Sequence, residues 1–248
     1  MKKRLILGDM HGLWDNYLEI YNYENPDEVI CLGDYLDSFT VSHARQEYGV
    51  KELFHLQASH HLKNKGKFII LLGNHDFHYL YGYPSIEKYS GFSYHTLSWA
   101  CLYLNEMLKQ KRIKAVYIDY KNKIIYSHAG ISNTWINEWN LKLYDINDLL
   151  DNQKMDPFMF THKEYDPYGD SIYSSCLWIR PSSLHSDMYK DENGEIWKQI
   201  VGHTPIKSIE NTEDLKLFVC DAIPYKYYLL HYFDDNDNFV KEEICHLG

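Results

Sequence analysis

Short apolar runs, each followed at once by glycine and polar residues, recur along the first half of the chain. Their length and their flanking turn-forming residues predict buried β-strands. The four runs are Lys3–Leu7, Val29–Leu32, Phe68–Leu72 and Ile124–Ser127. Two longer stretches with helical spacing lie between the first three, at about Trp14–Tyr23 and His43–Asn64. Strands that alternate with helices predict an α/β sheet with helices on its faces.

The second half of the chain is less regular. The segment of about residues 131–170 combines short helical patterns with turn signals, and we expect it to be a cap-like insertion in a single domain of residues 1–248. Asp234–Asp237 predicts a hairpin turn between two late strands. The strands predicted after the insertion are Cys176–Ile179, Ile196–Val201, Leu215–Cys220, Tyr227–Phe233 and Phe239–Ile244.

Polar side chains stand at the carboxyl ends of the early strands. In open α/β sheets these ends border the ligand crevice, so we expect clusters that are far apart in the sequence to meet at one edge of the sheet. A further histidine follows the strand that ends at Gly202. The side chains with metal-binding groups are Asp9, His11, Asp34, Asn74, His128 and His203.

This set of side chains offers carboxylate, imidazole and amide groups and no thiolate, which suits Mn²⁺, iron or Zn²⁺. Six ligands are too many for one catalytic ion with open positions and are sufficient for two. A carboxylate can bridge two ions, and Asp34, in the middle of the set, is the candidate bridge. Each motif alone is more typical of a turn, so the hypothesis depends on their occurrence together. A structural role is assigned to the histidines of the second predicted helix, His43, His55, His60 and His61.

The composition fits a folded protein and disfavours several other classes. Hydrophobic residues make up 45% of the 248 residues, yet no apolar run is long enough to span a bilayer. The net charge of −10 disfavours sequence-independent nucleic-acid binding and requires local cations wherever an anionic substrate binds. Five scattered cysteines without C-x-x-C spacing suit reduced thiols. We expect a soluble cytoplasmic protein without a nucleic-acid or membrane partner.

Five motifs, in order, resemble those of the calcineurin-like metallophosphoesterases. They are GDMHG (8–12), GDYLD (33–37), GNHD (73–76), SHAG (127–130) and GHTP (202–205). Within that family they resemble the phosphoprotein phosphatase superfamily, which includes bacterial and phage serine/threonine phosphatases and symmetrical dinucleoside tetraphosphatases. The resemblance implies an α/β fold built as a β-sandwich of mixed sheets flanked by helices, with a metal site at the carboxyl ends of strands. It also implies two divalent metal ions, with Mn²⁺ preferred over Fe or Zn²⁺.

The resemblance also implies a role for each motif residue. His75 corresponds to the general acid that protonates the leaving group, and Asp37 to the carboxylate that orients it. The segment LWIRP (177–181) resembles a Trp-x-Arg segment of the bacterial members. Arg180 is therefore the candidate phosphate clamp, because a guanidinium matches phosphate oxygens bidentately. The implied ligands are Asp9, His11 and Asp34 for the first metal ion, and Asp34, Asn74, His128 and His203 for the second.

Two positions depart from the family pattern. The protein phosphatases have Arg and then Gly after the second aspartate of the GDxxD motif, where this chain has Ser38 and Phe39. One phosphate-binding guanidinium is therefore missing, and Arg45 or a nearby lysine on the following helix is the candidate replacement. The C-terminal Asp-Thr-Gly segment of bacterial relatives is altered at residues 220–222 to Cys-Asp-Ala. These departures bear on the substrate more than on the chemistry.

We therefore predict a phosphatase that hydrolyses phosphate monoesters of a phosphorylated protein or a small molecule, with a metal-bound hydroxide. A symmetrical dinucleoside polyphosphate hydrolase is the alternative, since SHAGI and GHTP also resemble that branch. Ser38 disfavours this alternative, because a polyphosphate chain needs more cationic groups and Ser38 replaces one of them. An inactive scaffold with the same fold is a third hypothesis, which the complete ligand set and His75 disfavour.

Overall fold

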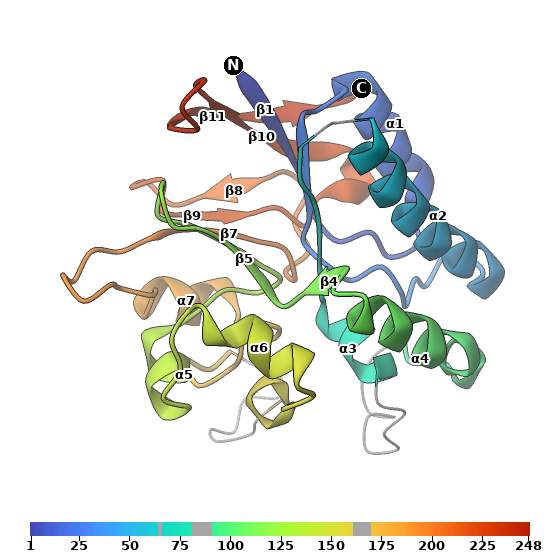
Figure 1. The fold of residues 1–248 in the computed structure, drawn as a ribbon, viewed down its shortest axis with the longest axis horizontal. Helices are drawn as coiled ribbons and strands as arrows, with labels where there is room; N and C mark the ends of the chain where they lie inside the picture. The colour runs from blue at the N-terminus through green and yellow to red at the C-terminus, as the bar shows by residue number, and fades with distance from the viewer. Residues whose placement is uncertain (64–65, 81–90, 161–169) are drawn as a thin grey trace.

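Two mixed β-sheets packed face to face form the centre of the molecule (Figure 1), as the computed structural model shows for residues 1–63, 66–80, 91–160 and 170–248. The first sheet consists, in spatial order, of β11 (Phe239–His246), β10 (Tyr227–Phe233), β1 (Lys2–Leu7), β2 (Glu28–Cys31), β3 (Phe68–Leu71) and β4 (Ile113–Lys114). The second consists of β5 (Val116–Asp119), β6 (Ile124–Ser127), β7 (Lys198–Val201), β9 (Leu217–Val219) and β8 (Glu210–Asn211).

Parallel pairing at the centre of each sheet aligns the ends of strands. In the first sheet β1, β2 and β3 run parallel, while β10 and β11 are antiparallel additions. In the second sheet β6, β7 and β9 run parallel, and β5 and β8 are antiparallel edges. The carboxyl ends of β1, β2 and β3 therefore lie together, and so do those of β6 and β7.

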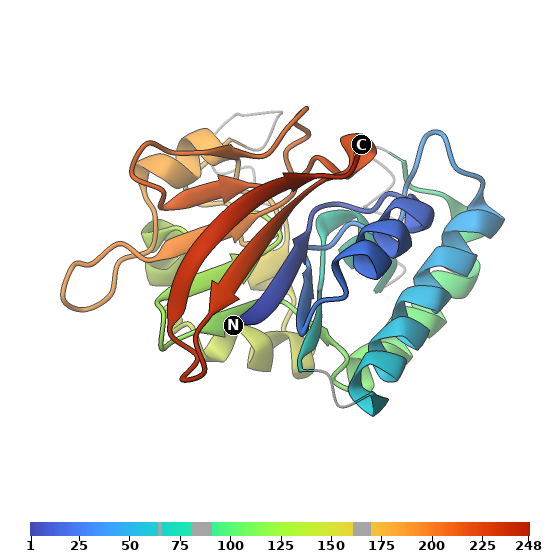
Figure 2. The same cartoon turned by 90° about the horizontal axis from the view of Figure 1, so that it is seen from above.

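Helices cover the outer faces of the sandwich (Figure 2). One group packs on the first sheet and a second group lies beside the second sheet, so the molecule has four layers. The first group is α1 (Trp14–Glu24), α2 (His43–Leu62) and α4 (Tyr94–Lys109). The second is α5 (Asn133–Glu138), α6 (Asp145–Asp151) and α7 (Pro181–Ser186). Shorter elements are α3 (Asn74–Leu80), which follows β3, and the 3₁₀ turns η2 (Asp156–Phe158) and η3 (Ile223–Tyr225).

The alternation of side chains along each strand divides the apolar residues between layers. On β1, Leu5 and Leu7 face the helices, while Ile6 points between the sheets. Ile6 there belongs to a buried cluster that also contains Tyr126 and Ile200 of the second sheet. Because both faces of each parallel core are covered, its strands carry consecutive apolar residues, such as Leu5–Leu7 in β1 and Val29–Cys31 in β2.

Several sequence predictions differ from the structure. Cys176–Ile179 is a buried turn and not a strand, and Trp178 and Ile179 donate to the Ser175 carbonyl at 2.9 and 3.1 Å. A short buried apolar run has no period that separates a strand from a turn. The helix predicted over His43–Asn64 ends at Leu62, and Asn64 lies outside the described residues. Helix α4 and strands β4, β5 and β8 were not predicted at all.

The remaining predictions of the second half fare better. The hairpin turn is confirmed, since Asp237 donates to the Asp234 carbonyl at 3.0 Å between β10 and β11. The strands predicted to begin at Ile196 and Leu215 begin two residues later. The predicted insertion of residues 131–170 contains α5, α6 and η2, and its residues 161–169 lie outside the described part. Its role as a cap stays a prediction.

Candidate metal centre and active site

The loops that follow β1, β2, β3, β6 and β7 meet at one end of the sandwich and bring the predicted ligands together. Three of these loops leave the first sheet and two leave the second. The expectation of a single sheet edge was therefore wrong. Two parallel cores in separate sheets produce the same sequence pattern as one larger sheet, and only the packing of the sheets distinguishes them.

Four of the site residues adopt a left-handed backbone although none is glycine. The φ angles of His11, Asp34, Asp37 and His203 are +40°, +50°, +61° and +63°. Such conformations cost on the order of 1 kcal/mol each and persist where the surroundings hold them. Here the loops hold one another, since the backbone N–H groups of Met10 and His11 both donate to the Asp34 carbonyl, at 3.0 and 2.8 Å. The turns thus aim these side chains into one space.

Glycines allow two carboxylates to lie against neighbouring backbone. A Cβ atom on Gly73 would sit 2.1 Å from Oδ1 of Asp34, and one on Gly202 would sit 2.1 Å from Oδ1 of Asp9. Asp9 also accepts the backbone N–H of His203 at 3.0 Å. The glycines of the motifs are therefore required for close approach as well as for turns.

Asp34 is common to two groups of ligand atoms. One group contains Asp34, His128 and His203, and the other contains Asp9, His11 and Asp34. In each group the ligand atoms all lie within 4.8 Å of one another. The placement of Asp34 is that expected of a carboxylate shared by two cations.

Asn74 joins the first of these groups through its amide oxygen. This Oδ1 lies 2.7 Å from Nε2 of His128 and 2.9 Å from Nδ1 of His203. Nε2 of His128 is also 3.4 Å from Oδ2 of Asp34. The structure therefore brings all six predicted ligands into one centre.

The imidazoles are oriented by backbone carbonyls. His11 and His128 each place Nδ1 against a carbonyl, of Leu36 at 2.7 Å and of Leu32 at 2.9 Å. His203 places Nε2 3.1 Å from the carbonyl of Trp178. A carbonyl accepts only from a protonated nitrogen, so the opposite ring nitrogen carries the lone pair that a cation needs.

The electrostatics of the carboxylates fit a cation site. Burial raises the pKa of Asp9 well above its usual range, and the negative charges of Asp221 and Asp34 add to the effect. Burial likewise raises the pKa of Asp221, to about 6. Carboxylates gathered out of water repel one another, and divalent cations held between them would remove that cost. The donor set thus fits two hard or borderline ions.

His75 and Asp37 form a hydrogen-bonded pair beside this centre. Nδ1 of His75 lies 3.0 Å from Oδ2 of Asp37, and its backbone N–H donates to Oδ1 of Asp34 at 2.8 Å. Burial alone would lower the pKa of His75, but the charges of Asp34 and Asp37 outweigh it and raise the pKa to about 9. Because Nδ1 is held by Asp37, Nε2 is the ring atom that can face a substrate.

A cavity of about 550 Å³ opens over the centre. Arg180 is the only arginine or lysine among the described residues that line it, and it is held by the carbonyl of His203 at 2.9 Å. Arg45 does not replace the missing guanidinium, because it is outside the lining and pairs with Asp15 at 2.7 Å. The lining consists of His11, Leu13, Asn16, Asp34, Asp37, Ser38, Phe39, Thr40, Asn74, His75, Arg180, His203, Pro205, Asp221 and Pro224.

The sequence matches the calcineurin-like phosphoesterase family over residues 2–235. The chain belongs to this family. It is therefore a hydrolase that acts on phosphate esters, and the family generally depends on two metal ions. Among curated proteins no sequence matches this phosphoesterase significantly.

Solved structures show the same fold at low sequence identity. A cold-active protein-tyrosine phosphatase of a psychrophilic Shewanella species is 17% identical, with a TM-score of 0.64 over 95% of this chain and 76% of its own. A protein serine/threonine phosphatase from Saccharomyces cerevisiae is 15% identical, with a TM-score of 0.55 over 100% of this chain and 80% of its own. In the described part of the phosphoesterase, no helix is both long and apolar enough to cross a bilayer.

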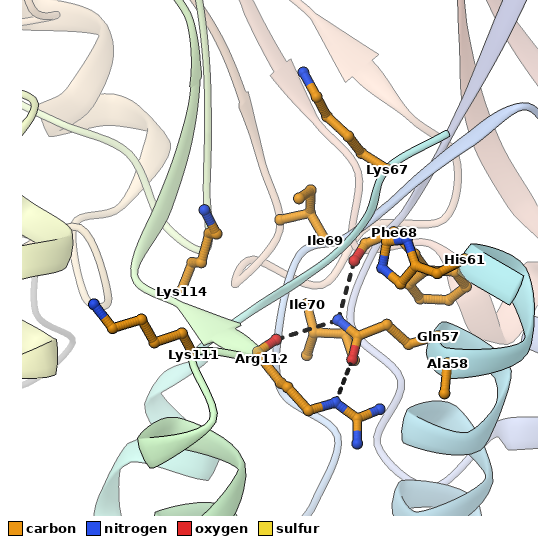
Figure 3. Close-up of a pocket in the computed structure, with 10 residues that line it drawn as sticks. All are labelled: Gln57, Ala58, His61, Lys67, Phe68, Ile69, Ile70, Lys111, Arg112 and Lys114. Atoms are coloured by element: carbon orange, nitrogen blue, oxygen red, sulfur yellow. Dashed lines mark hydrogen bonds between the residues drawn. The ribbon is translucent and has the colours of Figure 1, made fainter. Parts of the chain in front are cut away.

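A second cavity, of about 370 Å³, lies between α2, β3 and β4 and lacks the groups for this chemistry (Figure 3). Its described lining is rich in basic residues and contains no carboxylate. Arg112 donates to Oε1 of Gln57 at 2.9 Å, Lys67 donates to a tyrosine hydroxyl, and Lys111 pairs with Asp151 at 3.3 Å. Their charged ends point away from one another in Figure 3. The cavity over the candidate metal ligands is therefore the candidate active site.

Four polar residues of the site were not assigned from the sequence. Asp76 accepts the backbone N–H groups of Tyr35 and Gly73, at 2.9 and 3.1 Å, and so joins two ligand loops. Asp221 lines the cavity. His78, with Nε2 2.7 Å from Asp37, and Tyr79, whose hydroxyl donates to Asp37, surround that carboxylate. The i, i+3 spacing of His75 and His78 on one helix was the available signal.

Proposed function

We propose that this phosphoesterase is a phosphatase that hydrolyses phosphate monoesters with two divalent cations, Mn²⁺ first and Fe or Zn²⁺ as alternatives. The sharing of Asp34 between two groups of buried ligand atoms carries the proposal. Two bound cations would supply an activated water and neutralise charge on the phosphate. Asp9, His11 and Asp34 would hold the first, and Asp34, Asn74, His128 and His203 the second.

His75 is the proposed general acid. It lines the cavity next to Asn74, and Asp37 fixes its ring through Nδ1 at 3.0 Å. Nε2 would then give a proton to the alkoxide that leaves the phosphorus. The negative charges of Asp34 and Asp37 favour the protonated imidazole, so Asp37 orients the acid and helps to keep it charged.

Arg180 is the proposed phosphate clamp. Arg180 immediately precedes α7 and lines the cavity. Burial lowers its pKa, but the ordinary pKa of arginine is so high that the guanidinium stays charged. A single guanidinium among the described lining residues suits one phosphate group. The alternative of a dinucleoside polyphosphate substrate would place several more negative charges beside Asp37 and Asp221, and the described lining residues offer no second arginine or lysine to meet them.

The substrate class that follows is a phosphorylated protein or a small phosphate monoester. Both solved relatives carry the name of protein phosphatases, which favours a phosphorylated side chain. The cavity is open enough to receive one, since Phe39, Pro205 and Pro224 at its rim are exposed.

Metal analysis and turnover of Asp34→Asn test the proposal. With Mn²⁺, the wild-type protein should hydrolyse phosphate monoesters in a panel of phosphopeptides, nucleotides and dinucleoside polyphosphates. Asp34→Asn should bind less metal and lose at least about 100-fold in kcat, the scale of one electrostatic group in a reaction site. Asp235→Asn, at an exposed position outside the cavity, is the matched control. Unchanged metal content and turnover in Asp34→Asn would reject the shared ligand.

A further inference from the structure

The rim of the active-site cavity carries an apolar wall above its polar floor. Leu13, Phe39, Pro205 and Pro224 line the rim, whereas the candidate ligands below them are buried except for the partly exposed His11. Phe39 is 80% exposed, the largest exposed fraction of any aromatic side chain in the described residues. Exposure of a phenyl ring to water does not stabilise the free protein. The ring can therefore bury apolar surface against a bound ligand.

The loop that presents Phe39 is held in place. Oγ of Ser38 accepts the backbone N–H groups of Thr40 and Val41, at 3.2 and 3.1 Å. The buried side chain of Gln46 accepts the N–H of Ser38 at 3.2 Å and donates to the Val41 carbonyl at 2.7 Å. The exposure of Phe39 is therefore built into a hydrogen-bonded turn. At the position where relatives have arginine, Ser38 serves as an anchor of this turn.

Phe39 is close along the chain to the pair that is proposed to protonate the leaving alcohol. It stands two residues after Asp37, a separation of at most about 7 Å along the chain, and Asp37 is hydrogen-bonded to His75. A group that takes a proton from His75 must lie beside that pair, whereas Arg180 marks the phosphate side. The closeness of Phe39 to that pair along the chain favours contact with the organic part of the ester over contact with its phosphate.

We propose that this cavity selects phosphate esters of aromatic alcohols, whose ring stacks on Phe39 while the phosphate lies on the floor. The inference rests on the phosphatase function proposed above. Aromatic pairs contribute about 0.5–1.5 kcal/mol beyond area burial, which corresponds to about 2- to 12-fold in kcat/KM. Tyrosine phosphate in a peptide and a free aryl phosphate share this chemistry.

The test compares Phe39→Ala with the wild type on esters matched in pairs. One pair is a peptide that carries phosphotyrosine or phosphoserine at the same position, and the other is phenyl phosphate and an alkyl phosphate. Taking the variant-to-wild-type ratio for each ester removes the intrinsic difference between leaving groups. Phe39→Tyr keeps the ring, and Tyr23→Ala removes an aromatic side chain that is 69% exposed but outside the cavity.

Phe39→Ala should lower kcat/KM about 2- to 12-fold for the aromatic esters, and leave the phosphoserine peptide and the alkyl phosphate close to wild type. Phe39→Tyr and Tyr23→Ala should resemble the wild type on all four. If kcat/KM falls for both the phosphotyrosine peptide and phenyl phosphate, the aromatic ring of the ester is the recognised group. A larger fall for the peptide would identify a phosphorylated peptide as the substrate. Equal loss on aromatic and alkyl esters, or no loss, would overturn the inference.

Binding of phenylphosphonate and methylphosphonate, measured by calorimetry, separates this inference from the proposed function. The wild type should bind the phenyl compound more tightly, and Phe39→Ala should abolish the difference. If that result appears in a protein that hydrolyses none of the esters, aromatic recognition stands and the phosphatase function falls. If the wild type hydrolyses the esters but binds both phosphonates equally, the phosphatase function stands and this inference falls.

Discussion

At the scale of the residue, three donors surround the carboxylate of Asp37. His75, His78 and Tyr79 all contact it, and all three lie on α3. Burial alone would raise the pKa of Asp37, but the hydrogen bonds from His75 and His78 hold it below its usual value. The carboxylate therefore stays ionised, and it keeps the neighbouring His75 ring charged and in place.

Replacement of His75 by asparagine should separate acid catalysis from metal binding. Because His75 belongs to neither of the two ligand groups that contain Asp34, His75→Asn should retain the wild-type metal content of the proposed two-cation centre. General acid catalysis contributes about 10²–10⁴-fold, and most for leaving groups that need a proton. We expect a kcat loss in that range for alkyl phosphates and a much smaller loss for nitrophenyl phosphate. An identical loss on both esters would contradict the acid role.

At the scale of the element, the β2 and β3 loops are pressed together at Gly73. A Cβ atom there would lie 2.2 Å from the backbone nitrogen of Asp34 as well as against its carboxylate. Backbone cannot yield as a flexible side chain can, so any larger residue must separate the two loops. The spacing of the strands thus determines the position of the shared ligand.

Gly73→Ala should therefore lower metal content and turnover together. Overpacking of this kind costs about 1–3 kcal/mol, which denaturant unfolding would measure, and the displaced Asp34 would no longer serve two groups. Gly194→Ala is the control, because no atom lies within 4 Å of its added Cβ, although Gly194, unlike Gly73, has a positive φ, of +79°. It should lose some stability and keep full metal content. Wild-type metal binding in Gly73→Ala would show that the loops can separate freely.

At the scale of the whole molecule, one buried charge network joins the two sheets away from the metal centre. Arg4 on β1 pairs with Glu28 on β2 at 2.7 Å, and both side chains are almost fully buried. The same guanidinium reaches Asp119 at 3.1 Å and the hydroxyl of Tyr126 at 3.0 Å in the second sheet. A charge held between the sheets is stable only while its partners stay ionised.

Glu28→Gln should destabilise the fold and change its response to acid. Burial alone would raise the pKa of Glu28, but Arg4 and Lys2 lower it below its ordinary value of 4.5. Its contribution is therefore complete above that value and is lost as pH falls through the lowered pKa. Removal of one partner of a buried pair costs about 3–5 kcal/mol, measurable by urea unfolding at pH 7. As the pH falls from 7 through the lowered pKa of Glu28, the free energy of unfolding should decrease less in the variant than in the wild type. An equal decrease would show that ionised Glu28 does not stabilise the fold.

The sequence determined the local features of this protein. Apolar runs that are buried on both faces located β1, β2, β3 and β10, and the motifs at strand ends picked out the six side chains that the fold brings together as candidate ligands. These signals are local because a strand end, a turn and a ligand are set by neighbouring residues. Helix α4 was missed although its buried residues Ala100, Leu104 and Leu108 recur every four positions.

Only the tertiary structure decided what depends on residues that are distant in the chain. It divided the strands between two sheets, made 176–179 a turn, and showed that Arg45 pairs with Asp15 instead of reaching the cavity. It also placed Phe39 in the lining of the cavity that contains the proposed acid. The direction of a side chain and the residue with which it pairs depend on how whole layers pack. They cannot be inferred from the chemistry of a single residue.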